Sequence, residues 1–263
     1  MIGVYCVGCT DEDALLHPHA ASHTGLGHKS RMKFSVVVTI TLLLSAVQAL
    51  YSIPARCNGK IRLRMEWRDL SKEQQDRFIN ALLRMKENGK YEQFVRDHDQ
   101  YAASQMHRTD QFFVVHRMML AEFENELIKI DSNVILPYWD ASLDAHAPAF
   151  SNIWSAFGTG DADQCLRKSP FAKWTMNHPT PHCLRRGFST GDIGLSKFSD
   201  SAPLGYIVRT AETYTNFREL IEYGIHNQLH QILGGNNGAD FGQYFAANDM
   251  IFYLRKFFLR KDS

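Results

Sequence analysis

Hydrophobic residues recur at helical spacing along much of the chain. The clearest run follows a capping box, Ser71-Lys-Glu-Gln74, in which two side chains bond backbone N–H groups that the first helical turn leaves without partners. Its apolar residues then lie three or four positions apart as far as Asn88-Gly89. A later run ends at Gly234-Gly235, where glycine can adopt the left-handed conformation that closes a helix. The pattern predicts helices over residues 71–88, 91–101, 110–130 and 216–232, and one more from about residue 249.

The segment of residues 137–210 lacks this periodicity. It is rich in proline, glycine, serine and aspartate, with scattered aromatic residues, and strand patterns are scarce throughout the chain. We expect a long irregular connection there. The predicted fold class is mainly α, a helical bundle with long irregular loops, and such bundles commonly build metal sites from side chains that project inward.

The N-terminal region has the features of a targeting sequence. A basic start at Met32-Lys33, a short apolar stretch and small residues around Ala49 predict a secretory signal peptide over residues 32–49. A signal anchor that stays in the membrane is the alternative, although the apolar run is shorter than the roughly 20 residues of a good span. We expect residues 1–31 to be a non-structural extension and residues 50–263 to form the domain. The product is expected to be secreted or held in the lumen of a secretory granule.

Composition narrows the possible partners. Apolar residues make up 44% of the chain and charged residues 22%, as in ordinary globular proteins. The formal net charge of +1 gives no attraction to nucleic acid or anionic lipid, and no glycine-rich phosphate loop occurs. We therefore expect no nucleic-acid partner and no stable membrane insertion after signal cleavage.

Three cysteines remain after the expected cleavage: Cys57, Cys165 and Cys183. Cysteines of secreted proteins usually pair, so an odd number leaves one that is free or whose partner is missing. Cys165 and Cys183 could form a disulfide with each other, or one of them could join Cys57. The sequence leaves both pairings open.

Five histidines fall into two clusters that suggest a metal centre: His98, His107 and His116, then His226 and His230. His116 lies on the apolar face of its predicted helix. His226 and His230 are one turn apart, which brings their side chains onto one face. Each feature alone is also typical of ordinary core or surface histidines. Together, with few carboxylate or thiolate ligands beside them, they favour copper, zinc, iron or nickel over magnesium or calcium.

The residues around both clusters resemble the copper-site signatures of tyrosinases. The first signature is matched by Tyr91-x2-Phe94-x3-His98, His107-x4-Phe112-Phe113-x2-His116-Arg117-x2-Leu120-x3-Glu124 and Leu136-Pro137-Tyr138-Trp139-Asp140. The second is matched by Phe217-x4-Glu222-x3-His226-Asn227-x2-His230-x2-Leu233-Gly234-Gly235 and Ala247-Asn248-Asp249-x-Ile251-Phe252. The likeness extends over about residues 57–254, and its motifs occur in the order found in the family.

The resemblance implies a helical bundle around a dicopper site of type 3, with two copper ions and dioxygen as co-substrate. Such enzymes hydroxylate monophenols to o-diphenols and oxidise these to o-quinones, for pigment formation (melanin) or protein cross-linking. The implied partners are phenolic small molecules or tyrosyl side chains. Carried over residue by residue, His98, His107 and His116 bind the first copper ion, and His226 and His230 supply two ligands to the second.

Two further residues belong to the implied site. In tyrosinases a glutamate near the second site, with the asparagine after its first histidine, holds a water that deprotonates the phenol; here they are Glu222 and Asn227. A base helps because a phenol has a pKa of about 10. An exposed helix carboxylate is an equally weighted alternative for Glu222. We also expect Asp249 to orient a ligand ring, and Glu124 and Arg117 to be structural ion-pair partners.

The chain departs from the family at the sixth ligand. The family pattern has a His-His pair after the Asn-Asp-x-Ile-Phe run, and this chain has Arg255 and Lys256. A guanidinium stays protonated and offers no lone pair to a metal. The alternative to an active enzyme is therefore an impaired or inactive family member that lacks a complete second copper site. We expect the domain to be incomplete, truncated or variant, at its C-terminus.

Other classes of function fit less well. An oxygen carrier has no use for the phenol deprotonation that Glu222 and Asn227 imply. A zinc hydrolase would have a glutamate inside the pair of helical histidines, which His226-Asn-Gln-Leu-His230 lacks. Gln105 stands where some tyrosinases have a cysteine cross-linked to the next ligand, so no thioether is expected.

Overall fold

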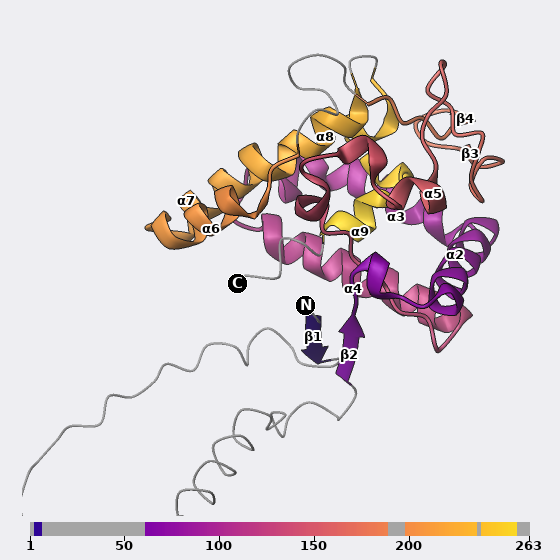
Figure 1. The fold of residues 1–263 in the computed structure, drawn as a ribbon, viewed down its shortest axis with the longest axis horizontal. Helices are drawn as coiled ribbons and strands as arrows, with labels where there is room; N and C mark the ends of the chain where they lie inside the picture. Colours follow the sequence, from indigo (N-terminus) through magenta and orange to yellow (C-terminus); the bar gives the residue numbers. More distant parts are fainter. Residues whose placement is uncertain (1–2, 7–60, 189–197, 236–237, 257–263) are drawn as a thin grey trace, which may run out of the picture. The chain divides into compact units, whose positions relative to one another are not determined.

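The computed structural model describes residues 3–6, 61–188, 198–235 and 238–256. The chain divides into two units, one of residues 64–263 with the first three residues and one of residues 4–63. Strand β1 (Gly3–Cys6), within the expected extension, pairs with β2 (Ile61–Arg64) in a two-stranded sheet (Figure 1). The predicted signal peptide and Cys57 lie outside the described residues, so the signal peptide stays a prediction.

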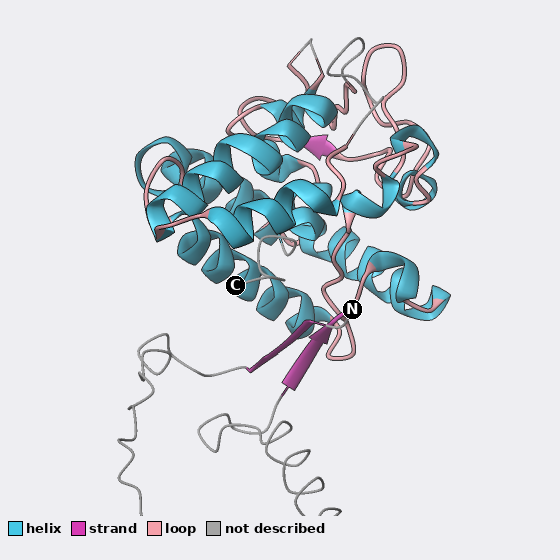
Figure 2. Ribbon diagram, turned by 60° about the vertical axis from the view of Figure 1, so that its left-hand side comes forward, coloured by secondary structure: helices cyan, strands magenta, loops and turns pink. Residues whose placement is uncertain are grey.

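The first three predicted helices are present. They are α2 (Lys72–Glu87), α3 (Lys90–Tyr101) and α4 (Phe112–Ile130), and a short 3-10 helix, η2 (Trp67–Asp69), precedes them. The capping box of α2 forms as expected: the Ser71 hydroxyl accepts from the Gln74 N–H at 3.2 Å, and the Gln74 side chain accepts from the Ser71 N–H at 2.9 Å. The prediction of a mainly helical fold is confirmed (Figure 2).

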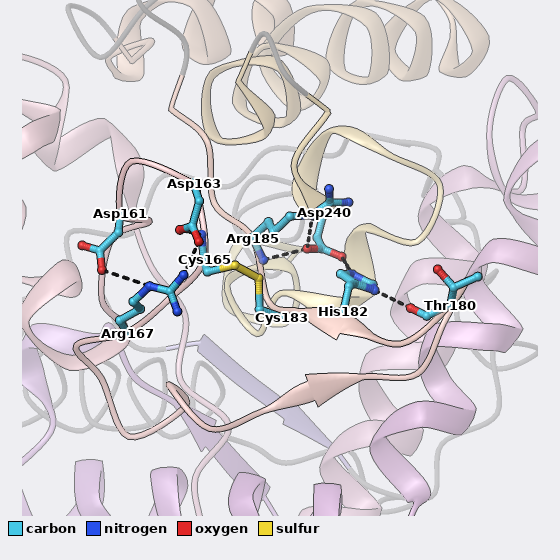
Figure 3. Close-up of a disulfide and its surroundings, with 9 residues drawn as sticks. All are labelled: Asp161, Asp163, Cys165, Arg167, Thr180, His182, Cys183, Arg185 and Asp240. Carbon is cyan, nitrogen blue, oxygen red and sulfur yellow. Dashed lines mark hydrogen bonds and ion pairs between the residues drawn. A yellow bond between two sulfur atoms is a disulfide. The ribbon is translucent and has the colours of Figure 1, made fainter.

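The stretch that we expected to be irregular contains mostly short elements. They are η4 (Ala141–Asp144), η5 (Pro148–Phe150), α5 (Ile153–Phe157) and the antiparallel pair β3 (Thr175–Met176) and β4 (His182–Cys183). Cys183 forms a disulfide with Cys165 (Figure 3). Of the two pairings that the sequence left open, the structure therefore has the one within this loop.

The longest element in this stretch, helix α6 (Ser201–Thr210), was also not predicted. Its buried residues, Leu204 and Ile207, lie one turn apart. Pro203 and Gly205 are weak helix formers and interrupt the pattern around them. Tertiary packing therefore stabilises a helix that the local sequence does not predict.

The fourth predicted helix is present but irregular. It comprises α7 (Tyr214–Glu219), a π-helical segment η6 (Leu220–His226) and α8 (Asn227–Gly234). The chain continues through the 3-10 turns η7 (Asp240–Gly242) and η8 (Ala246–Asn248) to α9 (Ile251–Lys256), near its predicted start. A second π-helical segment, η3 (Ala102–Met106), extends α3.

Helix α9 lies in the hydrophobic core, where residues 251–254 are fully buried (Figure 1). Tyr253 stacks on Phe123 of α4 with ring centroids 3.7 Å apart and packs edge-on against Tyr91 of α3 at 5.7 Å. Full burial of a side chain such as Phe123 stabilises the fold by about 1.5–3 kcal/mol relative to exposure. This packing fixes α3, α4 and α9 relative to one another, and two of these helices carry candidate ligands.

Candidate metal centre

Three elements bring His98, His107 and His116 together. His98 is on α3, His107 directly follows η3, and His116 is on α4. Their candidate ligand nitrogens all lie within 4.8 Å of one another. His98 and His116 are buried, and His107 is half-buried. At this spacing a single ion could contact all three imidazoles, a ligand set known from metalloenzymes.

His226 and His230 join the same group. They occupy successive turns where η6 meets α8, and their ring centroids are 4.7 Å apart. The His226 ring lies 5.9 Å from that of His107 and 6.3 Å from that of His116. The two histidine clusters, far apart in the sequence, are therefore neighbours in space.

Backbone carbonyls fix the rings of three of these histidines. Each Nδ1 atom lies 2.6–2.7 Å from a carbonyl oxygen, in the pairs His98 with Tyr244, His116 with Phe112, and His230 with Phe241. A carbonyl can only accept, so Nδ1 carries the proton and Nε2 keeps its lone pair. Metal-binding histidines are commonly oriented in this way, so the donor chemistry fits a transition metal.

Both π-helical segments end next to or at a histidine of the group. Segment η3 ends immediately before His107, and η6 ends at His226. Each π turn contains one more residue than an α turn, and such segments occur frequently at functional sites. Neither segment was predicted, because a π turn changes the number of residues in a turn and not the type of residue.

Two phenylalanine rings pack against the imidazoles. Phe252 of α9 lies 4.6 Å from the ring of His98 and 6.3 Å from that of His230. Phe112, at the start of α4, lies 4.9 Å from the ring of His226. These apolar contacts limit the rotation of the rings and shield one side of them from water.

A cavity of about 370 Å³ opens beside the histidines. This volume is within the range of small-molecule sites. Its lining includes four of the five histidines, all except His116, together with Glu222, Asn227, Arg108, Tyr223 and Tyr244. Both residues that we expected to act on a phenol therefore border the same cavity as the imidazoles.

The Glu222 carboxylate is held on both oxygens. Oε1 accepts from the Arg108 N–H at 2.7 Å, and Oε2 accepts from the Arg218 guanidinium at 3.0 Å. Arg108 has a left-handed backbone, with φ of 60°, which the bond from its N–H helps to hold. Glu222 is only 4% exposed, so it is not the exposed helix carboxylate of the alternative interpretation.

Asp249 does not orient a ligand ring, and that expectation was wrong. Its carboxylate accepts from Arg186 Nε at 2.9 Å and Nη2 at 2.7 Å, and from the Ile251 N–H at 3.0 Å. Carbonyl groups hold three of the rings instead. The structural role predicted for Glu124 is confirmed, because it pairs with Arg64 at 2.8 Å in the core.

Arg255 occupies the position where the family pattern has the sixth histidine. Its guanidinium donates to the His226 carbonyl and lies 5.9 Å from the centre of the Phe241 ring. The side chain is buried, and desolvation lowers the pKa of the guanidinium to about 9. It borders a smaller space with Trp139 and Gln228. Within the described residues the second cluster thus offers two imidazoles.

Comparison with known proteins agrees with this geometry. Residues 88–255 match the common central domain of tyrosinase. The chain is 30% identical over 264 residues to the tyrosinase-like protein phomQ1' of Diaporthe leptostromiformis, which covers 86% of this chain and 68% of that protein. It is 30% identical over 221 residues to the tyrosinase of Streptomyces galbus, which covers 73% of this chain and 78% of that enzyme.

The fold is similar to that of a polyphenol oxidase from Thermothelomyces thermophila, with a TM-score of 0.63 and 20% identity. The alignment covers 85% of this chain and 74% of the other, and it concerns the fold alone. The domain match includes all five histidines and most of the described helices. This chain therefore belongs to the tyrosinase family.

Proposed function

We propose that this copper oxidase of the tyrosinase family hydroxylates monophenols to o-diphenols and oxidises o-diphenols to o-quinones with dioxygen. The observation that carries the proposal is the single group of five histidines beside a cavity that Glu222 and Asn227 also border. The relatives named above are tyrosinases or tyrosinase-like proteins. Phenols are the substrates that membership of this family implies.

The donor set suits copper. His98, His107 and His116 would hold a first ion, and His226 and His230 would contribute two ligands to a second. Imidazole nitrogens are suitable copper ligands, and the protons on Nδ1 leave Nε2 as the donor atom in three of the five rings. Bound copper would supply the redox chemistry by which dioxygen is reduced and the phenol oxidised.

Glu222 and Asn227 would act on the proton of the phenol. A phenol with a pKa of about 10 keeps its proton at neutral pH unless a base is present. Arg218 and the Arg108 N–H hold the Glu222 carboxylate at the cavity. Its remaining lone pairs and the Asn227 amide can hold a water molecule. That water would accept the phenolic proton while the cavity orients the ring.

Phenolic small molecules and tyrosyl side chains of proteins are the proposed substrates, and the quinones would feed pigment or cross-linked protein. We assign residues 32–49 as a signal peptide on sequence grounds, which would place the reaction outside the cell or in a secretory-granule lumen. In the part of the chain that the structure describes, each helix is too short or too polar to cross a membrane.

Arg255 favours a second candidate, a family member whose catalysis is impaired. It places a guanidinium against the backbone of His226, where the family pattern has an imidazole. A guanidinium donates hydrogen bonds but has no lone pair for a metal. A protein of this kind would bind one copper ion or none and would not turn over phenols.

Copper content and turnover distinguish the two candidates. The full chain would be loaded with copper, dialysed, and assayed for copper per chain and for quinone formed from a monophenol and an o-diphenol. Two ions per chain with quinone formation support the oxidase. One ion or none, without turnover, supports the impaired member. His116→Ala should lower the copper content, whereas His146→Ala, which alters an exposed histidine outside the cavity lining, should leave it unchanged.

A further inference from the structure

One short segment supplies the carbonyls that hold a histidine from each cluster. We call residues 240–249 the carbonyl segment. The Phe241 carbonyl accepts from His230 Nδ1 at 2.6 Å, and the Tyr244 carbonyl accepts from His98 Nδ1 at 2.7 Å. The orientation of both rings therefore depends on where the carbonyl segment lies.

The third oriented ring is independent of this segment. His116 Nδ1 bonds to the Phe112 carbonyl at 2.7 Å, one turn earlier in α4. A regular helix fixes that carbonyl without outside help. His116 therefore serves as an internal control for any change in the carbonyl segment.

Asp240 anchors the start of the carbonyl segment. Its side chain is fully buried and accepts from His182 Nε2 at 2.7 Å, from the Arg185 N–H at 2.7 Å and from the Asn248 amide at 2.8 Å. Asn248 is near the other end of the segment, so the bond from Asn248 to Asp240 links the two ends of the segment. The bond from the Arg185 N–H joins the segment to the loop after β4. Figure 3 shows His182 and Arg185 converging on Asp240.

His182 belongs to a part of the chain that is itself restrained. It lies on β4 next to Cys183, which is bonded to Cys165, and β4 pairs with β3 (Figure 3). Its Nδ1 lies 2.6 Å from the Thr180 carbonyl oxygen and its Nε2 lies 2.7 Å from Asp240, and the two contacts together set the plane of the ring. His182 is outside the cavity lining and outside the copper-site motifs.

We infer that the His182–Asp240 pair positions His98 and His230 for metal binding by holding the carbonyl segment in place. The inference rests on the proposed copper binding and adds to it two positioning residues that touch neither the metal nor the substrate. Removing groups that orient metal-binding histidines typically lowers metal affinity by roughly 10- to 100-fold.

The first test uses the metal-free full chain, so it depends neither on copper binding nor on turnover. NMR of the chain with labelled histidine follows the Nδ1 protons of His98, His116 and His230 and their exchange with water. In Asp240→Asn we expect roughly tenfold faster exchange at His98 and His230 and no change at His116, because a weakened hydrogen bond exposes its proton. Unchanged exchange, or the same acceleration at all three rings, would overturn the inference.

Asp144→Asn is the matched control. The Asp144 carboxylate also accepts three bonds, from Arg68, Trp139 and Ser151, each at 2.8 Å, and these partners lie outside the carbonyl segment. We expect it to destabilise the fold while leaving exchange at all three rings unchanged. If it accelerates exchange at the same two rings as Asp240→Asn, general destabilisation explains the effect and the inference fails.

The second test titrates Cu(I) against a coloured chelator. Asp240→Asn and His182→Leu should bind Cu(I) roughly tenfold more weakly than the wild type, and Asp144→Asn should stay within about twofold. His182→Gln keeps a donor for Asp240 and should bind more tightly than His182→Leu. Wild-type affinity in Asp240→Asn would overturn the inference even if the protein oxidises phenols. If the wild type binds no Cu(I), the proposed function fails, and the exchange rates alone decide whether the pair positions the rings.

Discussion

The guanidinium of Arg255 donates a hydrogen bond to the backbone carbonyl of His226, one of the two imidazoles in the second cluster. Residue 255 follows Phe252 by three positions on α9, and Phe252 packs on the ring of His98. Residues three apart on a helix share a face. Position 255 therefore lies beside the histidine group, as the family pattern requires, and the difference is in the chemistry of its side chain.

Arg255→His should supply the missing imidazole. We expect the second copper ion to be retained more tightly during dialysis and quinone formation to rise roughly tenfold or more, because a neutral imidazole has the lone pair that a guanidinium lacks. Atomic absorption and quinone absorbance measure the two effects. Arg255→Gln removes the charge without adding a ligand and should gain neither. An equal gain in both variants would mean that the positive charge, and not the absent ligand, limits copper binding.

Glu222→Gln should affect monophenols more than o-diphenols. Loss of a base typically lowers a rate by roughly 100-fold or more, and the proton of a monophenol is harder to remove than the first proton of an o-diphenol. The ratio of monophenol to o-diphenol turnover measures the effect. Glu219→Gln is the control, because Glu219 also pairs with Arg218, at 3.1 Å, but is about half exposed. An unchanged ratio in Glu222→Gln would argue against its role in deprotonation.

The disulfide between Cys165 and Cys183 closes a loop with a sequence separation of 18 residues. Replacing both cysteines by serine should lower the free energy of unfolding by about 3 kcal/mol, because the cross-link restricts the unfolded chain. Urea unfolding measures the loss. A reductant should lower the stability of the wild type to that of the double variant and leave the variant unchanged. Equal stability of the two oxidised proteins would contradict the prediction.

Burial raises the pKa of the Tyr91 and Tyr253 hydroxyls well above the ordinary value. The unfolded chain ionises these tyrosines near pH 10 while the folded chain keeps their protons, so the free energy of unfolding should fall as the pH rises above about 10. Tyr253→Phe should make that fall less steep in urea unfolding experiments. Tyr206→Phe, at a position 64% exposed, should leave it unchanged. A slope that stays the same in Tyr253→Phe would count against this account.

The regular helices could be predicted because their signals are local. The capping box at Ser71 and the glycine pair at the end of α8 each act within a single turn, and the apolar spacing of α2, α3 and α4 does not depend on distant contacts. Helix α6 depends on tertiary burial of Leu204 and Ile207, and its proline and glycine interrupt the helical spacing of apolar residues. The π-helical segments escaped prediction because they change the number of residues in a turn and not the type of residue.

The candidate site could be predicted where side chains carry the chemistry. The histidines, Glu222 and Asn227 were proposed from spacing and family resemblance. The structure brings all of them except His116 to the lining of one cavity, and it places His116 beside His98 and His107. The roles of the Phe241 and Tyr244 carbonyls could not be predicted, because every residue has a carbonyl and only the tertiary structure determines which donor it accepts from. The prediction for Asp249 was wrong because its carboxylate forms an ion pair with a buried arginine that is distant in the sequence.

The π-helical segment Leu220–His226 carries both Glu222 and His226 of the candidate site on one continuous helix. Glu222 lies within the segment, and His230 lies in the α-helix beyond it. An added residue rotates everything after it by about 100° relative to a uniform α-helix. If the same sequence formed a uniform α-helix here, both histidines of the second cluster would be rotated together relative to the carboxylate. The spatial relation between carboxylate and imidazole therefore depends on how many residues this turn contains, and far less on which residues they are.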